Sequence, residues 1–393
     1  MLHVEPLSKS DGKSEYCSLG IWHIITGEYP PQQGGVSDYT NQVANGLASA
    51  DNSVHVWVPQ CNLPDNNAAG VSVHRLPGHF GPRALAQMAR AVRAKPCRVL
   101  VQYVPHAYGF KAMNLPFCLW LRSIRHVGPT VMFHEVAFPM NPGQLLRHHM
   151  LGAVTRLMAR LVCHSANRIM VAGARWQALL SELGTTAPIS WVPVPSNIAV
   201  VKNAVATARC RLRCAGANGL LMGHFANYSD YSVRRLSQVV PILFRERSDL
   251  SLLLLGSNSR EFRRHLLRAN PRLGRRVHAS GSLAPSELSS ALAACDLMVQ
   301  PYPDGVSTRR SSMAALLAHG SAIVTTNGIA TEHLWNQGRA VITAPVDDAD
   351  QLLDSIRQMI ASNELRRAYG RGAFELYDER FALRHTMASL MEF

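Results

Sequence analysis

Short apolar runs recur along the chain, and between them apolar residues repeat every three or four positions. Runs that are apolar on both sides predict buried parallel strands. The spacing of Tyr39, Val43 and Leu47 at i, i+4 and i+8 is typical of a helix that covers one face of a sheet. This repeated order of strand, loop and helix predicts an α/β fold. We expect strands at residues 19–26, 54–58, 99–103, 130–133, 168–171, 189–192, 220–222, 252–255, 277–280, 297–300, 323–326 and 340–343.

The periodicity weakens between Val194 and Gly219, and a second series of strands and helices begins at Leu220. The pattern therefore predicts two Rossmann-like, doubly wound domains. In open parallel sheets a ligand lies beyond the carboxyl ends of the strands, so two such domains favour a site in the cleft between them. We expect a polar leader over residues 1–18, a first domain over 19–195, a second over 196–372 and a final helix over 373–393.

Composition narrows the class of protein. With 393 residues, 47% hydrophobic and 17% charged, the chain is long and apolar enough for two globular cores. The net charge of +14 calls for an anionic partner, which could be nucleic acid, a lipid surface or a phosphorylated ligand. The aromatic content of 7% and the lack of a basic block argue against nucleic acid. Eight scattered cysteines without a C-x-x-C argue against disulfides and structural zinc.

No uninterrupted apolar run is long enough to cross a bilayer, and the first residues lack the apolar region of a signal peptide. We therefore expect a cytoplasmic protein. The basic residues Arg83, Arg90, Arg93 and Lys95 fit contact with the inner membrane face and fit a solvated helix face equally well.

Three segments at predicted strand ends carry candidate chemistry. After the first strand, Gly34 and Gly35 precede a helix whose free N–H groups favour an anion, although an ordinary glycine turn with Ser37 as N-cap explains them too. Later strands end in two further polar groups, Tyr103 with His106 and His134 with Glu135. Imidazole can donate or accept a hydrogen bond near neutral pH, and a histidine at a strand end is also a common structural residue.

The third segment follows the strand at 297–300. It offers Asp304, Ser307, Arg309 and Arg310 before a helix of small residues that begins near Ser311. Guanidinium groups beside a helix N-terminus suit a diphosphate, whereas adjacent arginines are also common on solvated loops.

Together these segments resemble the GT-B glycosyltransferases, and among them the retaining, nucleotide-sugar-dependent enzymes of family 4. The resemblance rests on residues 34–37, Tyr39, His134, residues 253–256, the run 295–301, the loop from Asp304 and the approach to the strand at 318–326. It implies that the C-terminal domain binds the nucleotide, that the N-terminal domain binds the acceptor, and that the last helix crosses back to the first domain. On this basis we expect His134, Glu135 and Asp304 to be catalytic, Gly34, Gly35, His224, Ser307, Arg309, Arg310 and Ser311 to bind the donor, and Ser37, Tyr103 and His106 to lie on the acceptor side.

Two departures from the family pattern matter. Its two glutamates, separated by seven residues, are missing: counting from Asp304 places Ser312 at the second, and counting back from residues 318–320 places Ala315 there. The Arg and Lys that often follow the first strand of the second domain are absent from residues 223–229. Our hypothesis is that Arg309 and Arg310, with Ser307 and the helix N-terminus at Ser311, supply the missing positive charge.

The sequence thus favours a metal-independent hexosyltransferase that moves a sugar from a nucleotide-diphosphate donor to a hydroxyl acceptor, a glycan or lipid-linked glycan, in cell-surface polysaccharide or glycolipid assembly. No cofactor is expected, and no D-x-D in a fitting context or His/Cys cluster suggests a metal. A nucleotide-sugar 2-epimerase, using Glu135 and Asp304, and a catalytically degenerate sugar-nucleotide-binding protein stay open as alternatives. A dehydrogenase is disfavoured, because no G-x-G-x-x-G follows the first strand.

Overall fold

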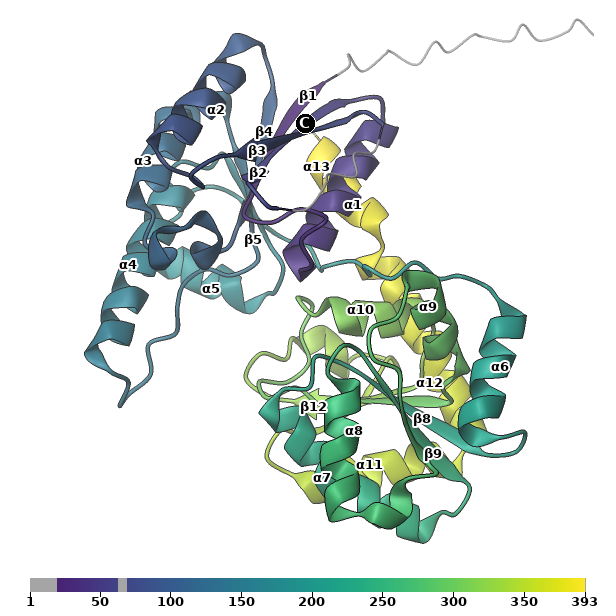
Figure 1. Ribbon diagram of the computed structural model, residues 1–393. Coiled ribbons are helices and arrows are strands. Elements are labelled where there is room, and N and C mark those ends of the chain that lie inside the picture. The colour runs from purple at the N-terminus through teal and green to yellow at the C-terminus, as the bar shows by residue number, and fades with distance from the viewer. Residues whose placement is uncertain (1–19, 63–68, 393) are drawn as a thin grey trace, which may run out of the picture.

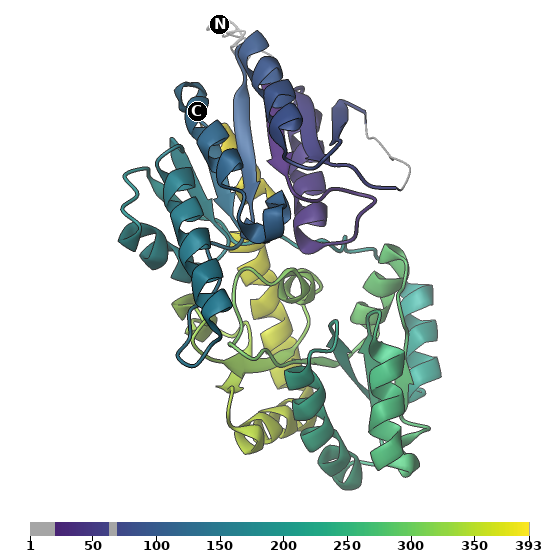
Figure 2. The same ribbon diagram turned by 60° about the vertical axis from the view of Figure 1, so that its left-hand side comes forward.

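The computed structural model describes residues 20–62 and 69–392, so the expected polar leader, 1–18, lies outside the described residues. These residues form two lobes, each built on a parallel sheet covered by helices on both faces (Figures 1 and 2). The first sheet has seven strands and the second has six. The α/β class with two Rossmann-like domains is confirmed.

The N-terminal sheet has the strand order β3-β2-β1-β4-β5-β6-β7. Its strands are β1 Ile21–Thr26, β2 Ser53–Pro59, β3 Val71–Leu76, β4 Arg98–Tyr103, β5 Thr130–Phe133, β6 Arg168–Val171 and β7 Ile189–Trp191. The helices of this domain are α1 Gly35–Ser49, α2 Pro82–Ala94, α3 Leu115–Ser123, α4 Leu146–Cys163 and α5 Arg175–Glu182. As the spacing predicts, Tyr39, Val43 and Leu47 form the buried face of α1.

One strand of this sheet escapes the sequence prediction. Strand β3 has the sequence VSVHRL, in which polar residues interrupt the apolar ones, and three of its six residues are only half-buried. It lies at the edge of the sheet, where one side of the backbone has no neighbouring strand from the described residues. Its pattern is therefore too polar to stand out as a buried strand.

The C-terminal sheet has the order β10-β9-β8-β11-β12-β13. Its strands are β8 Leu220–Phe225, β9 Leu250–Leu255, β10 Val277–Ala279, β11 Leu297–Gln300, β12 Ile323–Asn327 and β13 Ile342–Pro345. Its helices are α6 Ala204–Ala215, α7 Asp230–Glu246, α8 Ser259–Ala269, α9 Pro285–Ala294, α10 Ser311–Ala318, α11 Ala349–Ala361 and α12 Asn363–Leu376.

In each sheet the strand order reverses once. The reversal falls between β1 and β4 in the first sheet and between β8 and β11 in the second. Helices on either side of such a switch point leave a crevice at the carboxyl ends of the two strands. The loops after these four strands are therefore placed to build a ligand site.

The end of the chain joins the two lobes. The expected single helix over 373–393 is two helices, because α12 ends at Leu376 and a π-helical turn, Tyr377–Phe381, precedes α13 Leu383–Met391. Ala382 has extended backbone angles, which redirect the chain out of the C-terminal domain. Figure 1 shows α13 beside α1 in the first lobe, and Met387 there packs so closely on α1 that a Cβ on Gly46 would lie 2.8 Å from its sulfur.

Candidate functional site

The loops at the two switch points line cavities between the lobes. The first cavity, which we call the Arg310 cavity, has a volume of about 720 Å³. Gly34 and Gly35 line it from the N-terminal domain, and Arg310 and Ser311 line it from the C-terminal domain. Gly34, Gly35 and Arg310, all expected to bind the donor, therefore line one cavity from opposite domains.

A second cavity of about 440 Å³, which we call the His134 cavity, adjoins the first, since Gly35 and Ser311 line both. His134, Glu135 and Arg309 also line it. The two neighbouring arginines thus line different cavities: Arg309 lines the His134 cavity and Arg310 lines the Arg310 cavity.

The N-terminus of α1 differs from the sequence expectation. The Glu28 carboxylate accepts the backbone N–H groups of Val36 and Ser37 through Oε1, at 3.0 and 2.9 Å. These N–H groups are therefore not free for a phosphate, because the chain's own carboxylate already holds them. Gly34 makes this arrangement fit, since a Cβ there would lie 2.3 Å from Glu28 Oε1, whereas a Cβ on Gly35 meets nothing within 4 Å.

His134 is buried at the end of β5, where its backbone N–H donates to the Tyr103 carbonyl at 3.1 Å. Its Nε2 donates to Oε1 of Gln102, from the end of β4, at 2.8 Å. The ring meets Tyr39 edge-on at a centroid distance of 5.0 Å. Burial lowers the pKa of His134 to about 4, so the imidazole is neutral near pH 7 and suits hydrogen bonding better than proton abstraction.

Glu135 and His106 lie at the rim of the His134 cavity. Their side chains are 44% and 70% exposed, and His106 Nδ1 lies 3.6 Å from Glu135 Oε2. Both also line a third cavity of about 540 Å³, which we call the Trp176 cavity. Arg309 borders this space as well, so the same three side chains line both the His134 cavity and the Trp176 cavity.

Asp304 holds both arginines. Its Oδ2 accepts Arg309 Nη2 at 2.8 Å, and its Oδ1 accepts Arg310 Nη2. The Arg310 guanidinium also lies 4.7 Å above the Tyr302 ring. Burial alone would raise the pKa of Asp304, but the charges of Arg310 and Arg309 outweigh it and hold that pKa below its usual value. The Asp304 carboxylate, which lines neither cavity, is therefore engaged as an orienting anion, which does not fit the expected catalytic role.

A buried glutamate anchors the loop that carries Arg309 and Arg310 through hydrogen bonds. Glu332 is 7% exposed, and its carboxylate accepts the backbone N–H of Thr308 at 3.1 Å and the Thr308 hydroxyl at 2.8 Å. It also accepts the indole N–H of Trp335 at 2.8 Å. Sequence reasoning missed Glu332 because it follows Thr308 by 24 positions and matches no motif spacing.

Thr308 in turn ties the loop to the N-terminal domain. Its hydroxyl lies 2.8 Å from the Ala172 carbonyl, and the Trp191 indole N–H donates to it at 3.0 Å. Its carbonyl accepts the Val194 N–H at 3.0 Å. The residue just before the arginine pair is therefore a fixed point between the domains.

Besides Asp304, four of the expected site residues do not line the Arg310, His134 or Trp176 cavities. His224 is fully buried, with its Nδ1 at 2.7 Å from the Val299 carbonyl. Ser37 donates its hydroxyl to the Gln32 carbonyl at 2.6 Å. Ser307 is buried inside its loop, and Tyr103 packs in the core, where its ring centroid lies 4.8 Å from that of Phe133.

The alternation of side chains along β4 explains why Tyr103 does not lie on the acceptor side, where the sequence placed it. Successive side chains of a strand point to opposite faces, so Gln102 reaches His134 while Tyr103 enters the core on the other face. Placement at a strand end therefore identifies the right segment without identifying the right residue.

No group of three or more His, Cys, Asp or Glu side chains within the described ranges is arranged to hold a metal ion. Among the described helices, none is both long and apolar enough to cross a membrane.

Comparison with known proteins agrees with this fold. Residues 218–362 match the family model described as Glycosyl transferases group 1. No curated protein sequence matches the chain. Sucrose-phosphate synthase from Thermosynechococcus elongatus superposes with a TM-score of 0.69 at 16% identity, over 95% of this chain and 98% of that one.

Two further solved structures share the two-domain fold. Anabaena HepE, solved in complex with UDP and glucose, gives a TM-score of 0.66 at 14% identity, over 95% of this chain and 100% of that one. The trehalose-phosphate synthase from Burkholderia xenovorans, solved with glucose-6-phosphate, gives 0.67 at 12% identity, over 94% and 99%. These likenesses establish the GT-B fold.

Proposed function

We propose that this chain, which has the GT-B fold and matches the group 1 glycosyltransferase model over residues 218–362, transfers a sugar from a nucleotide-diphosphate donor to a hydroxyl acceptor with retention of configuration. One observation carries the proposal: Arg310 and the Gly34–Gly35 loop line the same interdomain cavity, at the switch points of both sheets. The Arg310 cavity is the proposed donor site.

Charge in the cleft suits a diphosphate leaving group. Two guanidinium groups share one carboxylate, so the cluster of Asp304, Arg309 and Arg310 keeps one net positive charge. The N-terminus of α10, at Ser311, adds a partial positive charge of roughly half a unit. These groups replace the cations absent from the loop after β8 and would stabilise the charge that develops on the diphosphate as the glycosidic bond breaks. On this proposal no metal is required.

The remaining space suits an acceptor. The Trp176 cavity adjoins the His134 cavity at Arg309 and offers an aromatic ring together with the Glu135–His106 pair. An acceptor hydroxyl entering from this side would meet the donor sugar beside the neutral imidazole of His134. Because His134 is a weak base and the Asp304 carboxylate is engaged by arginines, we assign the acceptor proton to the departing phosphate oxygen.

The acceptor is proposed to be a glycan or lipid-linked glycan in polysaccharide or glycolipid assembly, met at the inner membrane face. Side chains of Leu145, Leu146 and Met150 are exposed, Leu146 by 84%, and Arg147 stands among them. This surface adjoins the Trp176 cavity, which Leu151 lines. An apolar surface with basic neighbours is suited to an anionic bilayer.

A vesicle assay tests the membrane step. The wild type should co-sediment with anionic phosphatidylglycerol vesicles, whereas Leu146→Glu should stay in the supernatant. Leu212→Glu, at an exposed leucine of the C-terminal domain, should bind as the wild type does. Equal binding of all three proteins would refute the assignment of this surface.

A donor and acceptor panel tests the activity. Incubation with UDP- and GDP-sugars should release nucleoside diphosphate only when a hydroxyl acceptor is added, and NMR of the product should show the anomeric configuration of the donor. Exchange at C2 of the sugar without acceptor would indicate an epimerase. Donor binding by calorimetry without turnover across the panel would indicate a degenerate member of the fold.

A further inference from the structure

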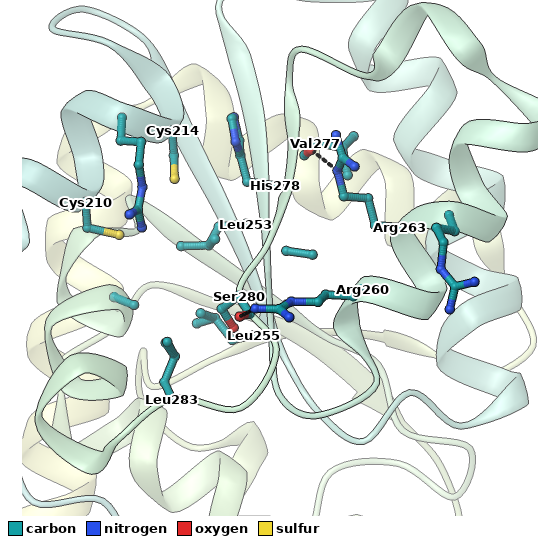
Figure 3. A pocket seen from close by; sticks show the side chains of 14 residues that line it. Cys210, Cys214, Leu253, Leu255, Arg260, Arg263, Val277, His278, Ser280 and Leu283 are labelled. Carbon is teal, nitrogen blue, oxygen red and sulfur yellow. Dashed lines mark hydrogen bonds between the residues drawn. The ribbon is translucent and has the colours of Figure 1, made fainter.

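A fourth cavity lies on the C-terminal domain at the edge of its sheet and has a volume of about 710 Å³. It shares no lining residue with the three interdomain cavities. Figure 3 shows Cys210 and Cys214 of α6 on one side, Arg260 and Arg263 of α8 on the other, and His278 of β10 between them. We call it the α6–α8 pocket.

The charge of this pocket is unbalanced. Four arginines line it, Arg213, Arg260, Arg263 and Arg264, and none of the lining residues carries a carboxylate. In the described part of the chain none of the four forms a salt bridge. Four like charges around one space repel each other, so an anion bound there would relieve the repulsion.

Two of these arginines are held in place by backbone carbonyls. Arg263 donates from Nε to Val277 at 2.7 Å and from Nη2 to Gly274 at 3.1 Å. Arg260 donates from Nη2 to Ser280 at 3.2 Å. These bonds leave other N–H groups of each guanidinium for a ligand, in an orientation that is already fixed.

His278 adds an unsatisfied polar atom. Its Nε2 is buried and has no hydrogen-bond partner among the described residues. A buried polar atom without a partner costs free energy, and a ligand in the pocket could supply the partner.

The floor of the pocket is apolar. Leu253 and Leu255 are buried side chains of β9, and Leu283 and Ala291 complete this surface. A basic rim over an apolar floor matches a ligand that has both a phosphate and an apolar part, and the volume lies within the range of small-molecule sites.

We propose that the α6–α8 pocket binds a phosphorylated small molecule with an apolar body, at a site separate from the transferase cleft. Geranyl diphosphate carries both parts, inorganic pyrophosphate carries only the charge, and geraniol carries only the apolar part. The inference does not depend on the proposed transferase activity, because binding can be measured without turnover.

Isothermal titration calorimetry with these three probes tests the proposal. Geranyl diphosphate should bind at least tenfold more tightly than pyrophosphate or geraniol. The double variant Arg213→Gln/Arg264→Gln should weaken its binding by about a hundredfold, since each lost charge-assisted contact is worth about tenfold. Arg268→Gln, an exposed arginine of α8 that does not line the pocket, is the matched control and should bind as the wild type does.

Two results would overturn the proposal: no binding of geranyl diphosphate, or an unchanged Kd in the double variant, which would place the probe outside this pocket. If pyrophosphate binds as tightly as geranyl diphosphate, the claim that the ligand has an apolar part is wrong. Thermal unfolding of both variants should match the wild type, because neither arginine of the double variant has a carboxylate partner among the described residues.

Discussion

Replacing Glu332 by Gln removes the charge that fixes the arginine loop. The carboxylate accepts the Thr308 N–H, the Thr308 hydroxyl and the Trp335 indole N–H, at 3.1, 2.8 and 2.8 Å. Glutamine keeps one acceptor oxygen and turns an amide N–H toward at least one of these donors. A lost charge-assisted hydrogen bond in a buried site costs about 1.5–3 kcal/mol, so the free energy of unfolding should fall by about that amount.

The same change should loosen Arg309 and Arg310, because Thr308 precedes them directly and fixes the loop between the domains. We expect the KM for the donor to rise by about tenfold, equivalent to about 1.4 kcal/mol of lost positioning.

Urea unfolding and steady-state kinetics on the donor identified by the panel measure these two effects. Glu364→Gln, an exposed glutamate of α12, is the matched control and should change neither quantity. If Glu332→Gln leaves both the unfolding free energy and the donor KM at wild-type values, the account of the loop is wrong.

The other predictions concern the cleft and its supports. Asp304→Asn should lower kcat by about tenfold with an unchanged pH profile, since loss of a general base would cost about 10²–10⁴ and alter that profile. Burial lowers the pKa of His134 and of His224 to about 4. Between that value and the ordinary histidine pKa, the unfolded chain therefore binds protons that the folded chain does not bind. Stability measured in urea should therefore fall between pH 6 and 4.5 by about 1.4 kcal/mol per pH unit for each histidine, and a flat profile would contradict this burial. Gly34→Ala should cost about 1–3 kcal/mol by crowding the carboxylate that caps α1, while Gly35→Ala, with open space around it, should leave thermal stability unchanged.

Much of the fold follows from periodicity, because buried parallel strands produce apolar runs that polar loops interrupt. All the strands expected from such runs are present, and β3 was missed because its edge position permits polar residues. The break at Ala382 was missed as well, since it is needed only to carry the chain from one domain to the other and no glycine or proline marks it.

The site was predictable as far as topology determines it. Gly34, Gly35 and Arg310 lie in loops that follow predicted strands, the family resemblance implies that they bind the donor, and they line one cavity. Glu28 and Glu332 were not expected, since each acts on a backbone segment that folding brings close and that no sequence motif marks.

The central claim is that the arginine pair supplies the positive charge for the donor diphosphate. The most direct measurement is kcat/KM for the donor in Arg309→Ala, Arg310→Ala and the double variant, with Arg268→Ala as the control outside the cleft. Loss of one such contact typically costs about 2.7–4 kcal/mol, so Arg310→Ala, at the donor cavity, should lose about a hundredfold or more. Arg309→Ala, at the adjoining His134 cavity, should lose less, and the double variant should lose the most. Donor turnover at the wild-type rate in the double variant would contradict the account.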